Sequence, residues 1–206
     1  MLFRSVLPVI AEMLKSDLDK DVRLQAVDAF VRYYIPADET GPIRTVFNRV
    51  KGAFAEPDRP TISEEVRVDA EATQALANTM QKDFNDDVRI AAVRALGSLK
   101  ARDQIPAMTS TFDDPIQREH LDVRVEIMGS LGIIRDATAG PVVQRALRSG
   151  NRRITAQAVT SIGLIGYKEA RPDLENIFKT TNDRAMKRRA LDSLALLRDP
   201  ASQPLF

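Results

Sequence analysis

The sequence has no cysteine, no tryptophan and a single histidine in 206 residues. The absence of cysteine excludes disulfides, thiolate metal sites and a cysteine nucleophile. Only 5% of the residues are aromatic, so a core must be built mainly from aliphatic side chains. No apolar stretch approaches the roughly 18 residues that a membrane-spanning helix needs, and we therefore expect no membrane partner.

Neither sign of charge dominates the chain. Thirty lysines and arginines face 29 aspartates and glutamates, which leaves a formal net charge of +1. This balance argues against strong electrostatic attraction to nucleic acid, which we do not expect as a partner. Residues 6–10 form a short apolar run that Glu12 soon follows, unlike a signal peptide. The sequence thus predicts a cytoplasmic protein, or a secreted one if Met1 replaces a removed signal peptide.

An internal repeat organises the sequence. Segments that begin at Val22, Val88, Val123, Ile154 and Met186 align column by column, and the last four starts lie 35, 31 and 32 residues apart. Apolar residues recur at offsets 0, 4, 5 and 8 from each start, which is the spacing of one helix face. A period in the thirties holds two helices of about a dozen residues each with their turns.

Offset 9 of the repeat carries small residues. Gly97, Gly132 and Gly163 occupy it in three repeats, although glycine inside a helix costs roughly 1 kcal/mol relative to alanine. We expect another helix to approach closely at these positions. The first helix of each pair is expected at residues 5–14, 73–82, 103–112, 139–147 and 170–178, and the turns between helices are rich in Asp, Asn, Ser and Gly.

The second repeat is irregular. Residues 41–55 are typical of a first helix, but Pro57 and Pro60 then interrupt the pattern. Residues 62–68 form either a shortened second helix or an extended stretch, and we favour a loop near 56–68. Tyr33 and Tyr34 precede this region and either contact a partner or pack against the loop.

These features resemble the HEAT-repeat family, in particular the short bacterial type that also occurs in phycobilisome-lyase-like proteins. The resemblance rests on the Asp-Val-Arg openings at 21–23, 87–89 and 122–124 and on the pairs Leu96-Gly97 and Leu131-Gly132. It implies an all-α fold, a right-handed α-solenoid of about five to six helix pairs in a single domain, 1–206. It also implies that the second helix of each pair lines the concave side.

Two sets of repeated polar positions are candidates for function. The columns that contain Asp21, Arg23, Asp87, Arg89, Asp122 and Arg124 are interpreted as a structural ladder of hydrogen bonds between neighbouring repeats, with a charged binding strip as the alternative. Offsets 3 and 6 lie off the apolar stripe and vary in residue type. The candidates for partner binding on the concave face are Gln25, Asp28, Arg94, Glu126, Gln157, Thr160, Arg189 and Asp192.

Other chemistry has little support in the sequence. A Glu-His pair can ligate metal, but His120 is the only histidine, so we expect neither a metal site nor a bound cofactor. Phosphate-binding glycine motifs and a nucleophile elbow are absent, and we expect no enzyme. Basic clusters at Arg145, Arg148, Arg152 and Arg153 and at Lys187, Arg188 and Arg189 are interpreted as solvated surface, with weak nucleic-acid binding as the alternative.

The sequence therefore predicts a non-catalytic scaffold that binds another protein or a peptide on the concave face. A bilin-lyase-like or chaperone-like helper is a second hypothesis, and it rests on the family resemblance alone. The oligomeric state stays open. The apolar residues near both ends are compatible with a longer parent protein, with a partner packed on the ends, or with Leu205 and Phe206 folded back.

Overall fold

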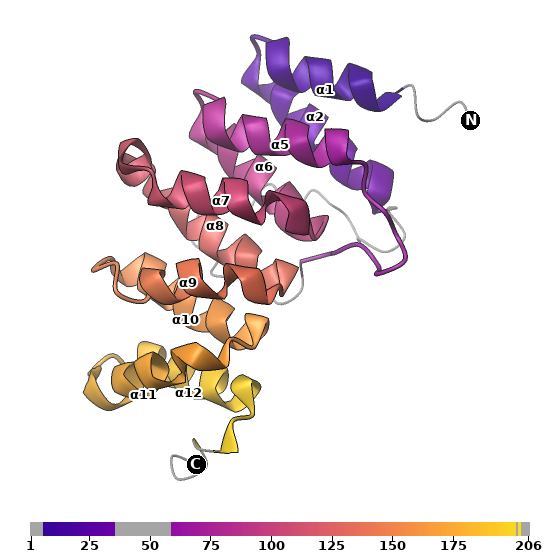
Figure 1. The fold of residues 1–206 in the computed structure, drawn as a ribbon. Coiled ribbons are helices and arrows are strands. Elements are labelled where there is room, and N and C mark those ends of the chain that lie inside the picture. Colours follow the sequence, from indigo (N-terminus) through magenta and orange to yellow (C-terminus); the bar gives the residue numbers. More distant parts are fainter. Residues whose placement is uncertain (1–5, 36–58, 201, 203–206) are drawn as a thin grey trace. The chain divides into compact units, whose positions relative to one another are not determined.

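The computed structural model describes residues 6–35, 59–200 and 202 (Figure 1). These residues form helices joined by short turns and no strand, as the repeat predicts. The α-helices are α1 (Val6–Ser16), α2 (Lys20–Tyr34), α5 (Ala70–Lys82), α6 (Asp86–Ser98), α7 (Ile105–Asp113), α8 (Leu121–Ile134), α9 (Gly140–Ala146), α10 (Arg152–Ile165), α11 (Arg171–Thr180) and α12 (Arg184–Leu197). Short 3-10 helices are η2 (Arg102–Gln104), η3 (Pro115–Glu119), η4 (Ala137–Ala139) and η5 (Lys168–Ala170).

The helices come in pairs. Each first helix (α1, α5, α7, α9 and α11) leads through a turn into a second helix (α2, α6, α8, α10 and α12), which makes five pairs in the described part of the chain. The all-α repeat of helix pairs is thus confirmed. The first helix expected at 41–55 and the residues Leu205 and Phe206 lie outside the described residues.

The chain divides into two compact units, Met1–Ile127 and Met128–Phe206, and α8 contributes to both. In the first unit, α1 packs on α2 and α5 on α6, while α2 contacts α6 and α1 contacts α5. In the second unit, α9 packs on α10, and α12 packs on both α10 and α11. A single domain over 1–206 stays a prediction.

The predicted apolar stripe forms the core of each unit. Val88, Ala92, Val93 and Leu96 of α6 are all fully buried. The equivalent residues of α10 are buried too, namely Ile154, Ala158, Val159 and Ile162. In α12 the stripe is looser, since Leu191 is only half-buried. Burial of aliphatic side chains at these offsets therefore holds the helix pairs together.

Asn or Asp residues start most of the second helices. The side chains of Asp19, Asn85, Asn151 and Asp183 each accept a hydrogen bond from the backbone N–H two residues further on. These caps satisfy N–H groups that have no partner inside the helix. The polar turns therefore fix where each second helix begins.

The irregular repeat is a loop where the structure describes it. Residues 59–69 contain no helix and have a turn at Glu64 and Glu65, so the prediction of a loop near 56–68 is confirmed from residue 59 onward. The alternative of a shortened helix over 62–68 is wrong. No helix in the described ranges is both long and apolar enough to cross a lipid bilayer.

Candidate functional site

Arg23 links two helix pairs of the first unit. Arg23 lies on α2, and its guanidinium makes two hydrogen bonds, of 2.7 Å and 3.0 Å, to Asp83, the residue that directly follows α5. The same guanidinium donates to the carbonyls of Asp17 and Leu18 at 3.0 Å and 3.2 Å. The side chains of Arg23 and Asp83 are only 2% and 5% exposed. This ion pair is therefore part of the folded framework.

The other two arginines of the column use different partners. Arg89 donates to the carbonyl of Met80 at 2.8 Å and also to the side-chain oxygen of Gln117 in η3. Arg124 stacks its guanidinium 4.5 Å from the centroid of the Phe112 ring, a cation–π contact. Burial lowers the pKa of Arg89 and the pKa of Arg124 below the usual arginine value.

Arg23 and Arg89 do not use Asp21 and Asp87, the aspartates of their own motifs, as the acceptors described above. Asp21, Asp87 and Asp122 occupy the first turns of α2, α6 and α8 and are exposed. Carboxylates in that position favour helix formation through the positive end of the helix dipole. Asp87 also faces Lys20 of α2 at 3.8 Å. The arginine column and the aspartate column thus have separate structural roles.

Two predicted partner-binding residues of the first unit lie together. Arg94 of α6 donates to Glu126 of α8 at 3.0 Å. The other oxygen of Glu126 accepts a hydrogen bond of 2.6 Å from Arg59, which the sequence analysis did not select. The three side chains are 15%, 11% and 10% exposed in the order Arg94, Glu126 and Arg59. We call this group the Glu126 cluster.

The other candidates of the first unit lie on α2. Gln25 is exposed, whereas Asp28 pairs with Arg32 at 2.6 Å and is only 18% exposed. Burial raises the pKa of Asp28, and Arg32 opposes that shift. One oxygen of Asp28 is buried without a hydrogen-bond partner in the described part of the chain. Asp28 is thus a partly desolvated acceptor on the second-helix side.

The candidates of the second unit are less alike. Gln157 is buried, at 2% exposure, while Thr160 is half-buried. Arg189 lies 3.5 Å from the Thr160 hydroxyl, and the exposed Asp192 faces Arg188 at 3.9 Å. Burial of Gln157 makes it a packing residue rather than a contact for a partner. We use the term second-helix face for the four candidates of the first unit, namely Gln25, Asp28, Arg94 and Glu126.

The segment 59–69 crosses the helices of the first unit at three anchor points. Arg59 contacts Glu126 on α8, and the N–H of Ile62 donates to the carbonyl of Ser98 at the end of α6 at 2.9 Å. At the far end, the hydroxyl of Tyr34 donates to Asp69 at 2.8 Å. Tyr34 therefore holds the end of the loop, one of the two roles that the sequence left open.

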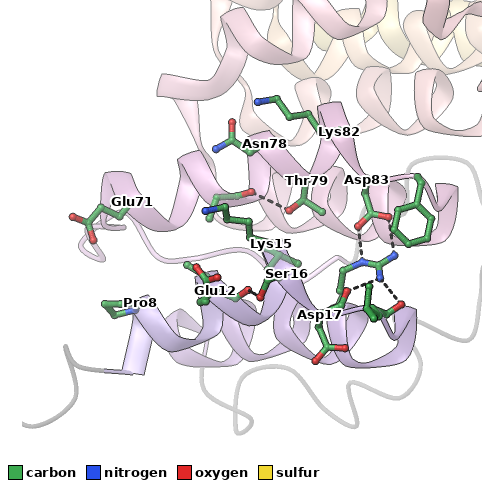
Figure 2. A pocket seen from close by; sticks show the side chains of 16 residues that line it. Pro8, Glu12, Lys15, Ser16, Asp17, Glu71, Asn78, Thr79, Lys82 and Asp83 are labelled. Carbon is green, nitrogen blue, oxygen red and sulfur yellow. Dashed lines mark hydrogen bonds and ion pairs between the residues drawn. The ribbon is translucent and has the colours of Figure 1, made fainter.

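A groove lies between α1 and α5 on the first-helix side of the same unit (Figure 2). Its volume is about 560 Å³, and Leu14, Ala75 and Thr79 contribute to its walls. Leu18 and Phe84 stand at its edge and are 91% and 81% exposed. Large exposed apolar side chains of this kind favour contact with another molecule. The repeat pattern of the second helices contains no signal for this groove, which lies between two first helices.

Serines at offset 7 of the repeat, which were not among the predicted site residues, connect neighbouring second helices. The buried hydroxyl of Ser161 in α10 donates to the carbonyl of Met128 in α8 at 2.7 Å. Ser193 in α12 donates in the same way to Val159 in α10, also at 2.7 Å. A serine at one fixed offset in consecutive repeats was a visible signal for this contact.

The basic clusters of the second unit contain several ion pairs. Arg148 reaches Asp173 at 2.6 Å and Arg152 reaches Asp183 at 2.5 Å. Burial raises the pKa of Asp173, but hydrogen bonds from Gln144 and Arg148 outweigh it and leave a net lowering. A hydrogen bond from Arg152 lowers the pKa of Asp183 as well. These carboxylates neutralise the arginines and weaken the case for phosphate binding.

His120 has a structural environment. It lies at the start of α8, where its carbonyl accepts the N–H of Arg124, and its ring contacts Asp86 at 2.8 Å. Within the described ranges, no group of three histidine or carboxylate side chains is arranged to hold a metal ion. The geometry around His120 therefore indicates a contact between α6 and α8.

The comparisons with known proteins found one family model that matches part of the chain. Residues 73–157 match the family model described as HEAT repeats. Among curated proteins, none is similar in sequence at a significant level.

Two similar solved structures have low sequence identity to this chain. One similar chain is from the complex of CpcE and CpcF of phycocyanin lyase from Nostoc sp. PCC7120, with 17% identity and a TM-score of 0.57. The alignment covers 97% of this chain and 68% of that one. A designed armadillo repeat protein in complex with the peptide (KR)4 is also 17% identical, with a TM-score of 0.44 and coverage of 93% and 99%.

Proposed function

We propose that the protein, whose residues 73–157 match the HEAT-repeat family model, is a non-catalytic scaffold that binds another protein or a peptide on the second-helix face. Repeat folds of this kind present long surfaces that are suited to binding extended partners. In the phycocyanin lyase of Nostoc, a chain of similar fold belongs to a complex of two proteins. That arrangement supports a protein as the partner here.

The Glu126 cluster is the observation that carries this proposal. Three charged side chains are largely removed from water on helices whose cores are otherwise aliphatic. Burying such charges costs free energy that apolar residues would not cost, so their net contribution to stability is small. Charge clusters of this kind contribute specificity when they meet a partner of complementary charge.

The experiment that tests the proposal compares capture by matched surface variants. Gln25→Arg alters an exposed residue on α2, and Gln74→Arg makes the same change on the first helix α5, where the side chain is also exposed. Proteins captured from a lysate of the source organism are identified by mass spectrometry with wild type and with each variant. We expect Gln25→Arg to lose a specific partner that Gln74→Arg retains.

Two results would contradict the proposal. Loss of the partner in Phe84→Ser with retention in Gln25→Arg would move the binding surface to the groove between α1 and α5. Retention in every variant would show that neither surface binds the captured protein.

A helper of tetrapyrrole attachment is the second candidate, and the fold similarity to a phycocyanin lyase chain is the observation that favours it. That similarity concerns the fold alone, since only 17% of the residues are identical. Titration of the protein with a bilin, followed by absorbance, separates the two candidates. A saturable spectral shift would support the helper, and no shift would leave the scaffold as the better account.

A further inference from the structure

We propose that the Glu126 cluster is a binding site for an arginine side chain of a partner, and that Arg59 occupies this site as an internal substitute. This proposal deepens the scaffold function and rests on it. The occupant is an extended peptide with an arginine and, three residues later, an aliphatic residue. That spacing is taken from Arg59 and Ile62, the two residues by which the chain's own segment contacts α6 and α8.

Glu126 lies at a variable position of the repeat and is nevertheless nearly buried. Glu126 occupies offset 3 of its repeat, where the other repeats have Gln25, Ala91, Gln157 and Arg189. The fold therefore requires no single residue type at this offset, although Ala91 and Gln157 are buried there. Glu126 is nevertheless only 11% exposed, because Arg94 and Arg59 cover its two carboxylate oxygens. The Glu126 carboxylate is therefore held by Arg94 of α6 on one side and covered by Arg59 of the segment 59–69 on the other.

The chemistry of the acceptor defines the ligand. The Arg94 guanidinium already satisfies one oxygen of Glu126, and the other oxygen receives the 2.6 Å hydrogen bond from Arg59. Without Arg59, a nearly buried carboxylate oxygen would lose its charged donor at a substantial free-energy cost. A planar guanidinium fits such a carboxylate better than an ammonium group does. The site therefore favours arginine over lysine.

The main chain supplies a second recognition element. The N–H of Ile62 donates to the carbonyl of Ser98 at 2.9 Å, and the Ile62 side chain is 8% exposed. Ser98 is the last residue of α6, where helix carbonyls lack partners within the helix. An extended peptide can make both contacts if its aliphatic residue follows the arginine by three positions.

The segment itself is held loosely between its anchors. Ser63, Glu64, Glu65 and Arg67 are exposed. A hollow of about 380 Å³ separates the segment from the turn after α6, with Ile62, Val66 and Leu99 among its lining residues. Segments with few buried contacts open locally at low free-energy cost. Arg59 and Ile62 belong to no helix, so their displacement leaves the backbone hydrogen bonds within the helices intact.

A competitor that is tethered to the protein lowers the apparent affinity for an external ligand. An arginine held on a short loop has an effective concentration on the order of millimolar at its site. A partner peptide must exceed that competition in wild type. Removal of the internal arginine should therefore increase the apparent affinity.

The test uses a fluorescently labelled peptide with the sequence of residues 59–69, added to the full chain. The receptor is the double variant Arg59→Ala/Ile62→Ala, in which the chain's own segment has lost both contacts. We expect saturable binding to this variant and at least about tenfold weaker binding to wild type. A peptide with alanine in place of the arginine that corresponds to Arg59, and a peptide with lysine there, should both bind about tenfold more weakly or worse, while the arginine that corresponds to Arg67 is kept in every peptide.

A third substitution localises the site. Adding Glu126→Gln to the double variant should abolish peptide binding, while Glu169→Gln, an exposed glutamate of η5, should not. Circular dichroism of each variant establishes that the helices remain folded. Peptide binding that persists with Glu126→Gln would overturn the proposal. Binding that does not depend on the arginine at the Arg59 position of the peptide would overturn it too.

Failure here is distinguishable from failure of the scaffold function. If the peptide does not bind but Gln25→Arg still loses a captured partner, the scaffold account stands and the arginine site is wrong. If the peptide binds but no partner depends on the second-helix face, the site exists and the proposed function is wrong.

Discussion

Gly132 lies directly against Ser161. A methyl group at position 132 would lie 2.6 Å from the Ser161 hydroxyl oxygen and 3.0 Å from its Cα. The missing side chain at Gly132 allows α10 to come close enough for Ser161 to donate to the carbonyl of Met128 at 2.7 Å. Gly163 and Ser193 repeat this relationship, since a methyl group at position 163 would lie 2.8 Å from the Cα of Ser193. A glycine and a serine together therefore set the spacing of the second helices in this unit.

The first prediction concerns Gly132→Ala, with Gly129→Ala in the same helix as its matched control. Both changes gain the same helix propensity of roughly 1 kcal/mol. A methyl group at 129 would meet the flexible end of Gln157 at 3.2 Å, whereas one at 132 meets backbone. We expect Gly132→Ala to be less stable than Gly129→Ala by about 1–3 kcal/mol in urea denaturation. Equal stability of the two variants would contradict the close approach.

The second prediction concerns the ion pair between Arg23 and Asp83. Replacing Arg23 with alanine leaves a carboxylate that is 5% exposed without its bidentate partner. We expect a loss of about 3–5 kcal/mol of unfolding free energy. Arg188→Ala is the control, because Arg188 is 86% exposed and its contact with Asp192 is long. That variant should change stability by no more than about 0.5 kcal/mol, and a similar loss in both variants would exclude a special role for Arg23.

The third prediction concerns Tyr34 at alkaline pH. Burial is the main cause that raises the pKa of Tyr34 to about 12. Because the folded pKa lies above the ordinary value of 10.0, Tyr34 contributes stability that is complete below pH 10 and is lost as the pH rises toward 12. Tyrosinate absorbance should show one late-ionising tyrosine in wild type. The late step should be missing in Tyr34→Phe, and its persistence there would assign it to another tyrosine.

The fourth prediction concerns Asp173 in the acid range. Burial raises the pKa of Asp173, but hydrogen bonds from Gln144 and Arg148 leave it below the usual value of 3.8. The depressed pKa means that this carboxylate stabilises the fold above the unfolded pKa and loses that effect as the pH falls through the folded one. Arg148→Ala should raise the pKa measured by carboxyl NMR. An unchanged titration would show that Gln144 alone holds the carboxylate.

The sequence predicts the helix pairs well because their cause is periodic. The stripe at Val88, Ala92 and Leu96 must face a neighbour in every repeat, so spacing alone locates the core. The close approach of helices at the offset 9 glycines could be predicted because these glycines also recur at a fixed position of the repeat. The caps at Asn85 and Asn151 follow from the short polar turns.

Contacts that depend on the approach of separate segments were not predictable. The acceptor of Arg23 is Asp83, 60 residues away, rather than an aspartate of its own motif. Glu126 and Arg94 were both candidates, but nothing in the periodicity places Arg59 beside them, because Arg59 lies in the one segment that departs from the repeat. The groove between α1 and α5 likewise depends on how far apart two first helices lie.

The most direct test of the scaffold account is site-specific photo-crosslinking. A photoreactive amino acid is placed at Gln25 on the second-helix face and, in a second variant, at Phe84 beside the groove, since both side chains are exposed. Each variant is irradiated in a lysate of the source organism, and crosslinked proteins are identified by mass spectrometry. The account predicts a discrete crosslinked protein from position 25 and none from position 84. The reverse pattern, or no crosslink at either position, would contradict it.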